Sequence, residues 1–129
     1  MSSEVIQKVI AEYFAATRAM DLNTWLSTFA PDAISYEPER PALTNHDALS
    51  KLFQDIAGLF EKVGLQEESI FITNNQAAVK WTGYGIGKNG REVTFEGIDI
   101  FEINELGKIQ KMWAYWHPAA MIAQLQGNF

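Results

Sequence analysis

The feature that most constrains the fold is the second half of the sequence, where short apolar stretches alternate with turn signals. Four stretches follow one another: SIFIT before Asn74-Asn75, AAVKWTGYGI before Lys88-Asn89-Gly90, REVTFEGIDIFEI before residues 104–107, and KIQKMWAYWH before Pro118. The stretches are rich in β-branched and aromatic residues, and the turns contain Asn, Gly or Pro. This pattern predicts an antiparallel meander from Leu65 onward.

The first half has helical periodicity instead. Apolar residues recur every three or four positions after Ser2, which predicts a first helix with Tyr13 on its buried stripe. Asp21 should cap a short second helix, LNTWLSTFA, which Pro31 should end. The segment AISYEP that follows is expected to be extended.

A third helix is predicted after Thr44 or Asn45. Its apolar stripe continues through Phe60 and Val63, and Gly64 should be its C-terminal cap. The end of the chain, PAAMIAQLQGNF, should be a short helix or a loose tail. Helices first and an antiparallel sheet afterwards predict one α+β domain over residues 1–129, in which the helices cover the face that the sheet must bury.

Composition excludes several classes of function. The chain has no cysteine, which excludes disulfides and thiolate chemistry and favours a cytoplasmic protein. It has neither a signal peptide nor an apolar run of membrane-spanning length. The net charge of −6 comes without a basic cluster, so nucleic acid is not an expected partner. Because no apolar run is long enough to span a membrane, a membrane is not an expected partner either. His46 and His117 are isolated, so no metal site is predicted.

Asp99 stands out because it lies in the middle of the strand-like stretch FEGIDIFEI. In an extended chain it shares a face with Phe95 and Phe101, whereas Glu96 and Glu102 point the other way. A sheet that lies on helices buries its less polar face. Asp99 is therefore predicted to point inward.

The preceding hairpin gives a second argument about Asp99. A two-residue Asn89-Gly90 turn would place Lys80 opposite Asp99, whereas a three-residue loop with Gly90 left-handed would place Val79 there. The second register separates apolar from polar residues better, and we prefer it. It leaves Asp99 with no cation opposite, so its pKa should rise and the acid could donate a hydrogen bond. A structural role, with Asp99 bound to a backbone amide or a hydroxyl, stays open.

Three segments line up in order along the chain: AEYFAATRAMDL with Tyr13, TFAPDAISYEP with Glu37, and GIDIFEINELGKI with Asp99. Together they resemble the ketosteroid isomerases. These belong to the nuclear transport factor 2-like superfamily, which also holds SnoaL-like polyketide cyclases and limonene epoxide hydrolases. The resemblance implies a cone-shaped, cystatin-like α+β fold, in which N-terminal helices pack on a strongly curved antiparallel sheet and enclose a pocket.

The resemblance also implies a reaction, the transfer of a proton next to the carbonyl of a small hydrophobic ketone. Glu37 would be the base, and Tyr13 and Asp99 would stabilise the charge that develops on the carbonyl oxygen. Glu39 could replace Glu37 as the base. Neither a metal nor an organic cofactor would be needed. The substrate-binding wall would come from five further residues: Trp81, Phe95, Met112, Ala114 and Trp116.

Other functions are compatible with the same sequence. A SnoaL-like polyketide cyclase is one, and a non-catalytic domain that binds a small apolar molecule is another. An epoxide hydrolase fits less well, because Arg40 and Arg91 do not assemble into the aspartate-arginine-aspartate arrangement of that class. Ile109, Trp113 and Tyr115 should form an apolar stripe on the outer face of the sheet, which predicts a homodimer.

Overall fold

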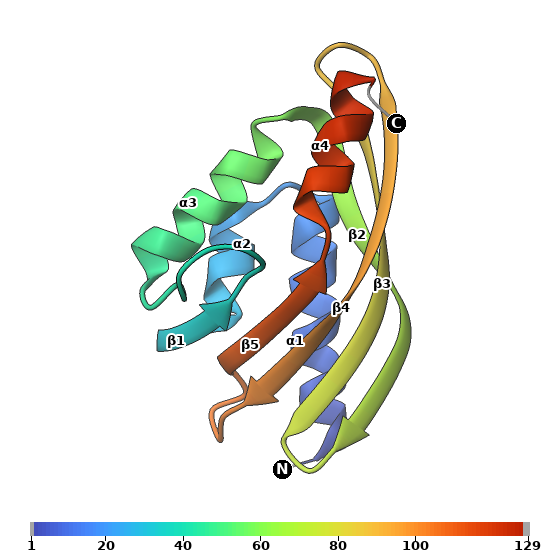
Figure 1. The fold of residues 1–129 in the computed structure, drawn as a ribbon. Coiled ribbons are helices and arrows are strands. Elements are labelled where there is room, and N and C mark those ends of the chain that lie inside the picture. The colour runs from blue at the N-terminus through green and yellow to red at the C-terminus, as the bar shows by residue number, and fades with distance from the viewer. Residues whose placement is uncertain (1, 128–129) are drawn as a thin grey trace.

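The computed structural model describes residues 2–127 of the protein. In this part of the chain the elements are α1 (Ser3–Arg18), α2 (Leu22–Ser27), β1 (Phe29–Tyr36), α3 (His46–Ala57), β2 (Phe60–Thr73), β3 (Gln76–Gly87), β4 (Glu92–Ile103), β5 (Ile109–Trp116) and α4 (Pro118–Gln126). The strands form one curved sheet in the order β1-β5-β4-β3-β2, and the helices gather on its inner side (Figure 1). This architecture confirms the predicted α+β class.

Helix α1 forms as predicted. The Ser2 side chain accepts a hydrogen bond from the Val5 backbone N–H, and the apolar stripe of the helix is buried against the sheet. The end of α1 is fastened to β2, because the Leu65 N–H donates to Thr17 Oγ1 at 3.0 Å and Arg18 donates to the Leu65 carbonyl at 2.9 Å. These bonds fix the helix that carries Tyr13.

The predicted second helix is too long. Helix α2 ends at Ser27, and the following residues, Pro31 among them, belong to β1. Strand β1 pairs in parallel with β5, and the Ile109 N–H donates to the Thr28 carbonyl at 2.8 Å. Pro31 lies where the β1–β5 register shifts, on the edge strand of the sheet, so its missing N–H breaks no regular ladder.

The predicted third helix is also too long. Helix α3 is capped by Asn45, ends at Ala57 with Gly58 as its C-cap, and is followed by β2, which contains both Phe60 and Val63. Phe60 and Val63 are buried as strand residues, and the β2–β3 register shifts after Phe60, so their spacing imitates a helix. Gly64 is therefore not a helix cap.

Gly64 has a different role from the predicted one. A Cβ atom placed on Gly64 would lie 2.7 Å from the Cα of Arg18. The backbone of β2 thus approaches α1 at a distance that excludes any side chain at this position.

The preferred hairpin register is confirmed. Val79 lies opposite Asp99, Trp81 opposite Gly97 and Gly83 opposite Phe95. The loop between β3 and β4 has Gly90 in the left-handed conformation, with φ of +83°. This register places Asp99 on the inner face of the sheet.

The outer stripe differs from the prediction at one residue. Ile109 is completely buried in the core, because the pairing of β4 with β5 shifts between Glu102 and Ile103. Trp113 and Tyr115 do point outward, and Tyr36 stacks on Trp113 with ring centroids 5.6 Å apart. We call Tyr36, Ile98, Trp113 and Tyr115 the outer patch.

The end of the described chain is the helix α4, which begins at Pro118; residues 128–129 of the predicted helix or tail lie outside the described residues. Among residues 2–127, no helix has both the length and the apolar character that crossing a membrane requires.

Candidate active site

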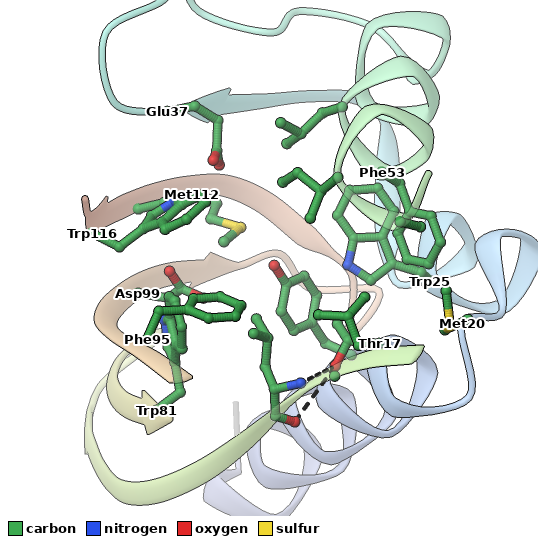
Figure 2. A pocket seen from close by; sticks show the side chains of 18 residues that line it. Thr17, Met20, Trp25, Glu37, Phe53, Trp81, Phe95, Asp99, Met112 and Trp116 are labelled. Atoms are coloured by element: carbon green, nitrogen blue, oxygen red, sulfur yellow. Dashed lines mark hydrogen bonds between the residues drawn. The ribbon is translucent and has the colours of Figure 1, made fainter. Parts of the chain in front are cut away.

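A cavity of about 90 Å³ lies between the inner face of the sheet and the helices. All eight side chains predicted for the site line it: Tyr13, Glu37, Trp81, Phe95, Asp99, Met112, Ala114 and Trp116. They come from α1, from the end of β1 and from β3, β4 and β5. Figure 2 shows Glu37 reaching in from one side of the cavity, while Asp99 approaches from the sheet.

Asp99 is the most deeply buried acid of the site, with only 2% of its surface exposed. Its cross-strand neighbours are Val79 and Ala114, neither of which can offset a negative charge. Burial raises the pKa of Asp99 well above its usual value, and the nearby charge of Glu37 raises it further. Trp81 opposes this rise in pKa, although its buried Nε1 makes no hydrogen bond within residues 2–127. The acid therefore keeps its proton to a higher pH than an exposed aspartate would.

Tyr13 is buried among aromatic rings on α1. Its ring meets Phe101 edge-on, with centroids 5.1 Å apart, and lies 5.8 Å from the ring of Trp25. Burial raises the pKa of Tyr13 well above its usual value, and the charges of Asp99 and Glu37 add to this effect. Tyr13 thus remains a hydroxyl that can donate a hydrogen bond.

Glu37 follows directly after β1 and is held by a neighbouring hydroxyl. Ser35 Oγ donates to Glu37 Oε2 at 2.9 Å. Ser35 is itself buried, and its backbone forms two hydrogen bonds of 2.9 Å with Leu43. Burial raises the pKa of Glu37, although Ser35, Arg40 and Trp116 each oppose this rise.

Glu39 does not lie at the site. Its side chain is exposed, and it is not among the residues that line the cavity. Its backbone has a φ of +59°, so the chain turns sharply after Glu37 and carries Glu39 away from the cavity. Of the two glutamates, Glu37 is therefore the one that faces the cavity.

The three acidic groups share a space that is otherwise apolar. No lysine, arginine or histidine is among the lining residues of the described chain. Within residues 2–127 there is also no group of histidine, aspartate and glutamate side chains that could hold a metal ion. Glu37 raises the pKa of Asp99, and both acids raise the pKa of Tyr13, so the titrations of the three groups are linked.

Several parts of the wall escaped the sequence analysis, among them the start of β2 with Val63, Gly64 and Leu65. Trp25 was assigned only to the second helix, yet it lines the cavity beside Tyr13, and its indole lowers the pKa of the Tyr13 hydroxyl. Helix α3 contributes Leu52, Phe53 and Ile56, whose helical spacing indicated only a buried face. A buried apolar stripe looks the same in a sequence whether it faces a filled core or a cavity.

A family model described as "SnoaL-like domain" matches residues 10–112. No curated protein matches the sequence significantly. Many solved structures, in contrast, do match this chain. AclR, a putative hydroxylase from Streptomyces galilaeus, has a TM-score of 0.84 at 19% identity, with 98% of this chain and 83% of that chain covered.

Two further solved structures are similar. TerC, co-crystallised with polyporic acid, has a TM-score of 0.83 at 16% identity and covers 95% of this chain and 98% of its own. An LEH-like epoxide hydrolase from M. tuberculosis has a TM-score of 0.77 at 16% identity, with 98% of this chain and 92% of that chain covered. At such identities these likenesses show a shared fold.

Proposed function

Since this chain belongs to the SnoaL-like domain family, within the nuclear transport factor 2-like superfamily, we propose that it catalyses a cofactor-independent proton transfer on a small hydrophobic ketone. The reaction would be an enolisation or double-bond isomerisation like that of the ketosteroid isomerases. One observation carries the proposal: Tyr13, Glu37 and Asp99 face the same apolar cavity. The pKa values of all three groups are raised by burial.

In this proposal Glu37 is the base. Its carboxylate removes a proton from the carbon next to the carbonyl group, the C–H electron pair forms a carbon–carbon double bond, and the carbonyl π electrons move to oxygen. The same glutamic acid then returns the proton further along the conjugated system. A raised pKa suits this role, because it makes the ionised carboxylate a stronger base at a pH near its pKa.

Tyr13 and Asp99 would hold the oxygen on which negative charge develops. Burial raises the pKa of both groups, so each keeps its proton to a higher pH than an exposed group would and can then donate a hydrogen bond to that oxygen. The Trp25 indole beside Tyr13 lowers the pKa of that hydroxyl, but burial keeps the pKa above its usual value. In an apolar cavity such donors are stronger than in water.

The proposal is tested with a β,γ-unsaturated cyclic ketone, 3-cyclohexen-1-one, whose conversion to the conjugated isomer is followed by ultraviolet absorption. Deuterium uptake from heavy water detects enolisation even without net isomerisation. Glu37→Gln should lower the rate by roughly a hundredfold or more, and Tyr13→Phe and Asp99→Leu should also lower it, since each loses a donor. The matched control is Glu39→Gln, which should leave the rate unchanged. Equal rates for Glu37→Gln and the wild type would overturn the proposal.

A second function uses the same first step. Glu37 could remove a proton to form an enolate, whose carbon then attacks a second carbonyl of the same molecule, and Asp99, which faces the same cavity, could give its proton to the new alkoxide. This is a ring closure of the polyketide-cyclase kind. A linear diketone separates the two functions, because only a cyclase would convert it to a product with a new carbon–carbon bond.

We also propose that two copies pair through the outer patch. Ile98 lies opposite Tyr115 across the β4–β5 ladder, and Tyr36 lies opposite Trp113 across the β1–β5 ladder, so the four side chains form one continuous surface. Tyr36, Ile98 and Tyr115 are 40%, 44% and 57% exposed. A continuous apolar surface of this kind is typical of a protein interface.

A further inference from the structure

We propose that the substrate is a small molecule with a single uncharged ring that bears the ketone and with no further ring fused to it. This inference rests on the function proposed above and adds a limit on the size and charge of the substrate. It follows from the volume of the cavity, the packing of its walls and the absence of a cation among its lining residues.

The volume sets the first limit. The cavity measures about 90 Å³. An apolar cavity of roughly 150 Å³ in another protein holds one benzene molecule and little else. The space within these walls is smaller and is not fully enclosed. It therefore accommodates no more than one ring, and a fused skeleton of several rings has no room beside the three acids.

The packing of the walls opposes widening on the sheet side. The rings of Trp81, Phe95 and Trp116 contact one another, with centroid distances of 5.8, 6.2 and 5.7 Å. The Phe95 ring lies on the backbone of Gly83, where a Cβ atom would be 2.5 Å from the ring. Moving any of these rings outward would break close contacts with the others.

Helix α3 offers the alternative route to a larger cavity. It supplies Leu52, Phe53 and Ile56 to the opposite wall, and these side chains are not locked in the aromatic cluster of the sheet. Phe53 is partly exposed and its ring faces Trp25 at 5.1 Å. Shortening Phe53 is thus the substitution that should admit a larger ligand.

Charge sets the second limit. Glu37 and Asp99 line the cavity, and no lysine, arginine or histidine of the described chain does so. A carboxylate or phosphate on the reacting ring would lose its hydration without gaining a cation and would face Glu37. In contrast, Tyr13 and Asp99 offer donors, and the buried Trp81 Nε1 has no hydrogen-bond partner in the described chain. An uncharged carbonyl oxygen is the acceptor that these donors fit.

The test uses phenols, whose oxygen resembles that of the enol, and follows their binding by calorimetry and by tryptophan fluorescence. The affinities for phenol and for estradiol, a four-ring phenolic steroid, show the effect of ligand size. Methyl 4-hydroxybenzoate and 4-hydroxybenzoate compare charge at constant ring size. For the wild type we expect phenol to bind at least about tenfold more tightly than estradiol, and the ester at least about tenfold more tightly than the carboxylate.

Phe53→Ala should change the size selectivity alone. We expect the ratio of estradiol to phenol affinity to rise at least about tenfold, while the ratio for the ester and the carboxylate stays the same. Phe71→Ala is the matched control, because Phe71 is 70% exposed on β2 and does not line the cavity. Circular dichroism verifies that both variants are folded. If a variant does not fold, the affinities measured for the wild type still test the inference.

The outcomes separate this inference from the proposed function. If estradiol binds the wild type as tightly as phenol, or the carboxylate as tightly as the ester, the limits on size or charge are wrong and the proton-transfer function still stands. If no phenol binds and 3-cyclohexen-1-one is not turned over, the proposed function fails and this inference fails with it. The predicted selectivity, with turnover of the one-ring ketone, supports both.

Discussion

Ser35 donates a hydrogen bond to Glu37, the proposed base, and this bond affects both the position and the pKa of the Glu37 carboxyl group. Ser35 Oγ donates to one carboxyl oxygen, Oε2, so in the proposed reaction the other oxygen would accept the transferred proton. This bond favours the ionised carboxylate and lowers a pKa that burial raises. Ser35 thus acts as a positioning residue that also sets the basicity of Glu37.

Ser35→Ala should therefore raise the pKa of Glu37. Glu37 acts as a base only when ionised, so the rate should increase with pH through this pKa, and the whole rise should move to higher pH in the variant. Carbon-13 NMR of the glutamate carboxyl groups measures the pKa directly, and the pH dependence of isomerisation measures its consequence. The control is Ser69→Ala, an exposed serine of β2. An unchanged or lowered Glu37 pKa in Ser35→Ala would contradict the assigned role of the bond.

The approach of α1 to β2 at Gly64 leads to a prediction at the scale of elements. Gly64→Ala would place a methyl group 2.7 Å from the Cα of Arg18, so α1 and β2 would have to separate. We expect the free energy of unfolding to fall by about 1–3 kcal/mol, as overpacking usually costs. Urea denaturation measures this change. Glu61→Ala, an exposed position of the same strand, should change stability by less than about 0.5 kcal/mol. A stable Gly64→Ala variant would show that the contact between the elements relaxes freely.

The elements also show what the sequence can predict and what it cannot. The hairpin register around Asp99 was predictable because the loop Lys88-Asn89-Gly90 is local and the two faces of β4 differ in polarity. The start of β1 was not, because it is fixed by parallel pairing with β5, some eighty residues later in the chain, as in the pair Phe29 and Ile109. No local pattern encodes such a contact.

The candidate site was predictable to a similar extent. Tyr13, Glu37 and Asp99 were found through the resemblance and the alternation of β4, and the structure brings them to one cavity. Trp25 and the α3 wall were not found, because an apolar helix face has the same period whether or not a cavity lies beneath it. Likewise, the register shift that buries Ile109 comes from one extra residue within β5, Gln110, which periodicity cannot resolve.

At the scale of the whole molecule, β5 connects the proposed site to the proposed dimer interface. Along this strand Met112, Ala114 and Trp116 line the cavity, while Trp113 and Tyr115 belong to the outer patch. Alternation allows one face of the strand to be altered without touching the other. Dimer formation and ligand binding can therefore be tested separately in the same molecule.

Tyr115→Glu should disrupt the dimer and spare the cavity. In a symmetric dimer, a carboxylate in the middle of the outer patch would lie near the same carboxylate of the second copy or be buried without its hydration shell. We therefore expect dimerisation to weaken at least about tenfold. Sedimentation equilibrium measures the association. The control is Leu106→Glu, since Leu106 is 84% exposed in the turn before β5 and lies outside the patch. A wild type that is monomeric at every concentration would refute the dimer, and a Tyr115→Glu dimer of unchanged affinity would place the interface elsewhere.

Because Tyr115 points away from the cavity, phenol should bind the monomeric variant with its wild-type affinity. A loss of binding on dissociation would instead mean that pairing shapes the site through β5.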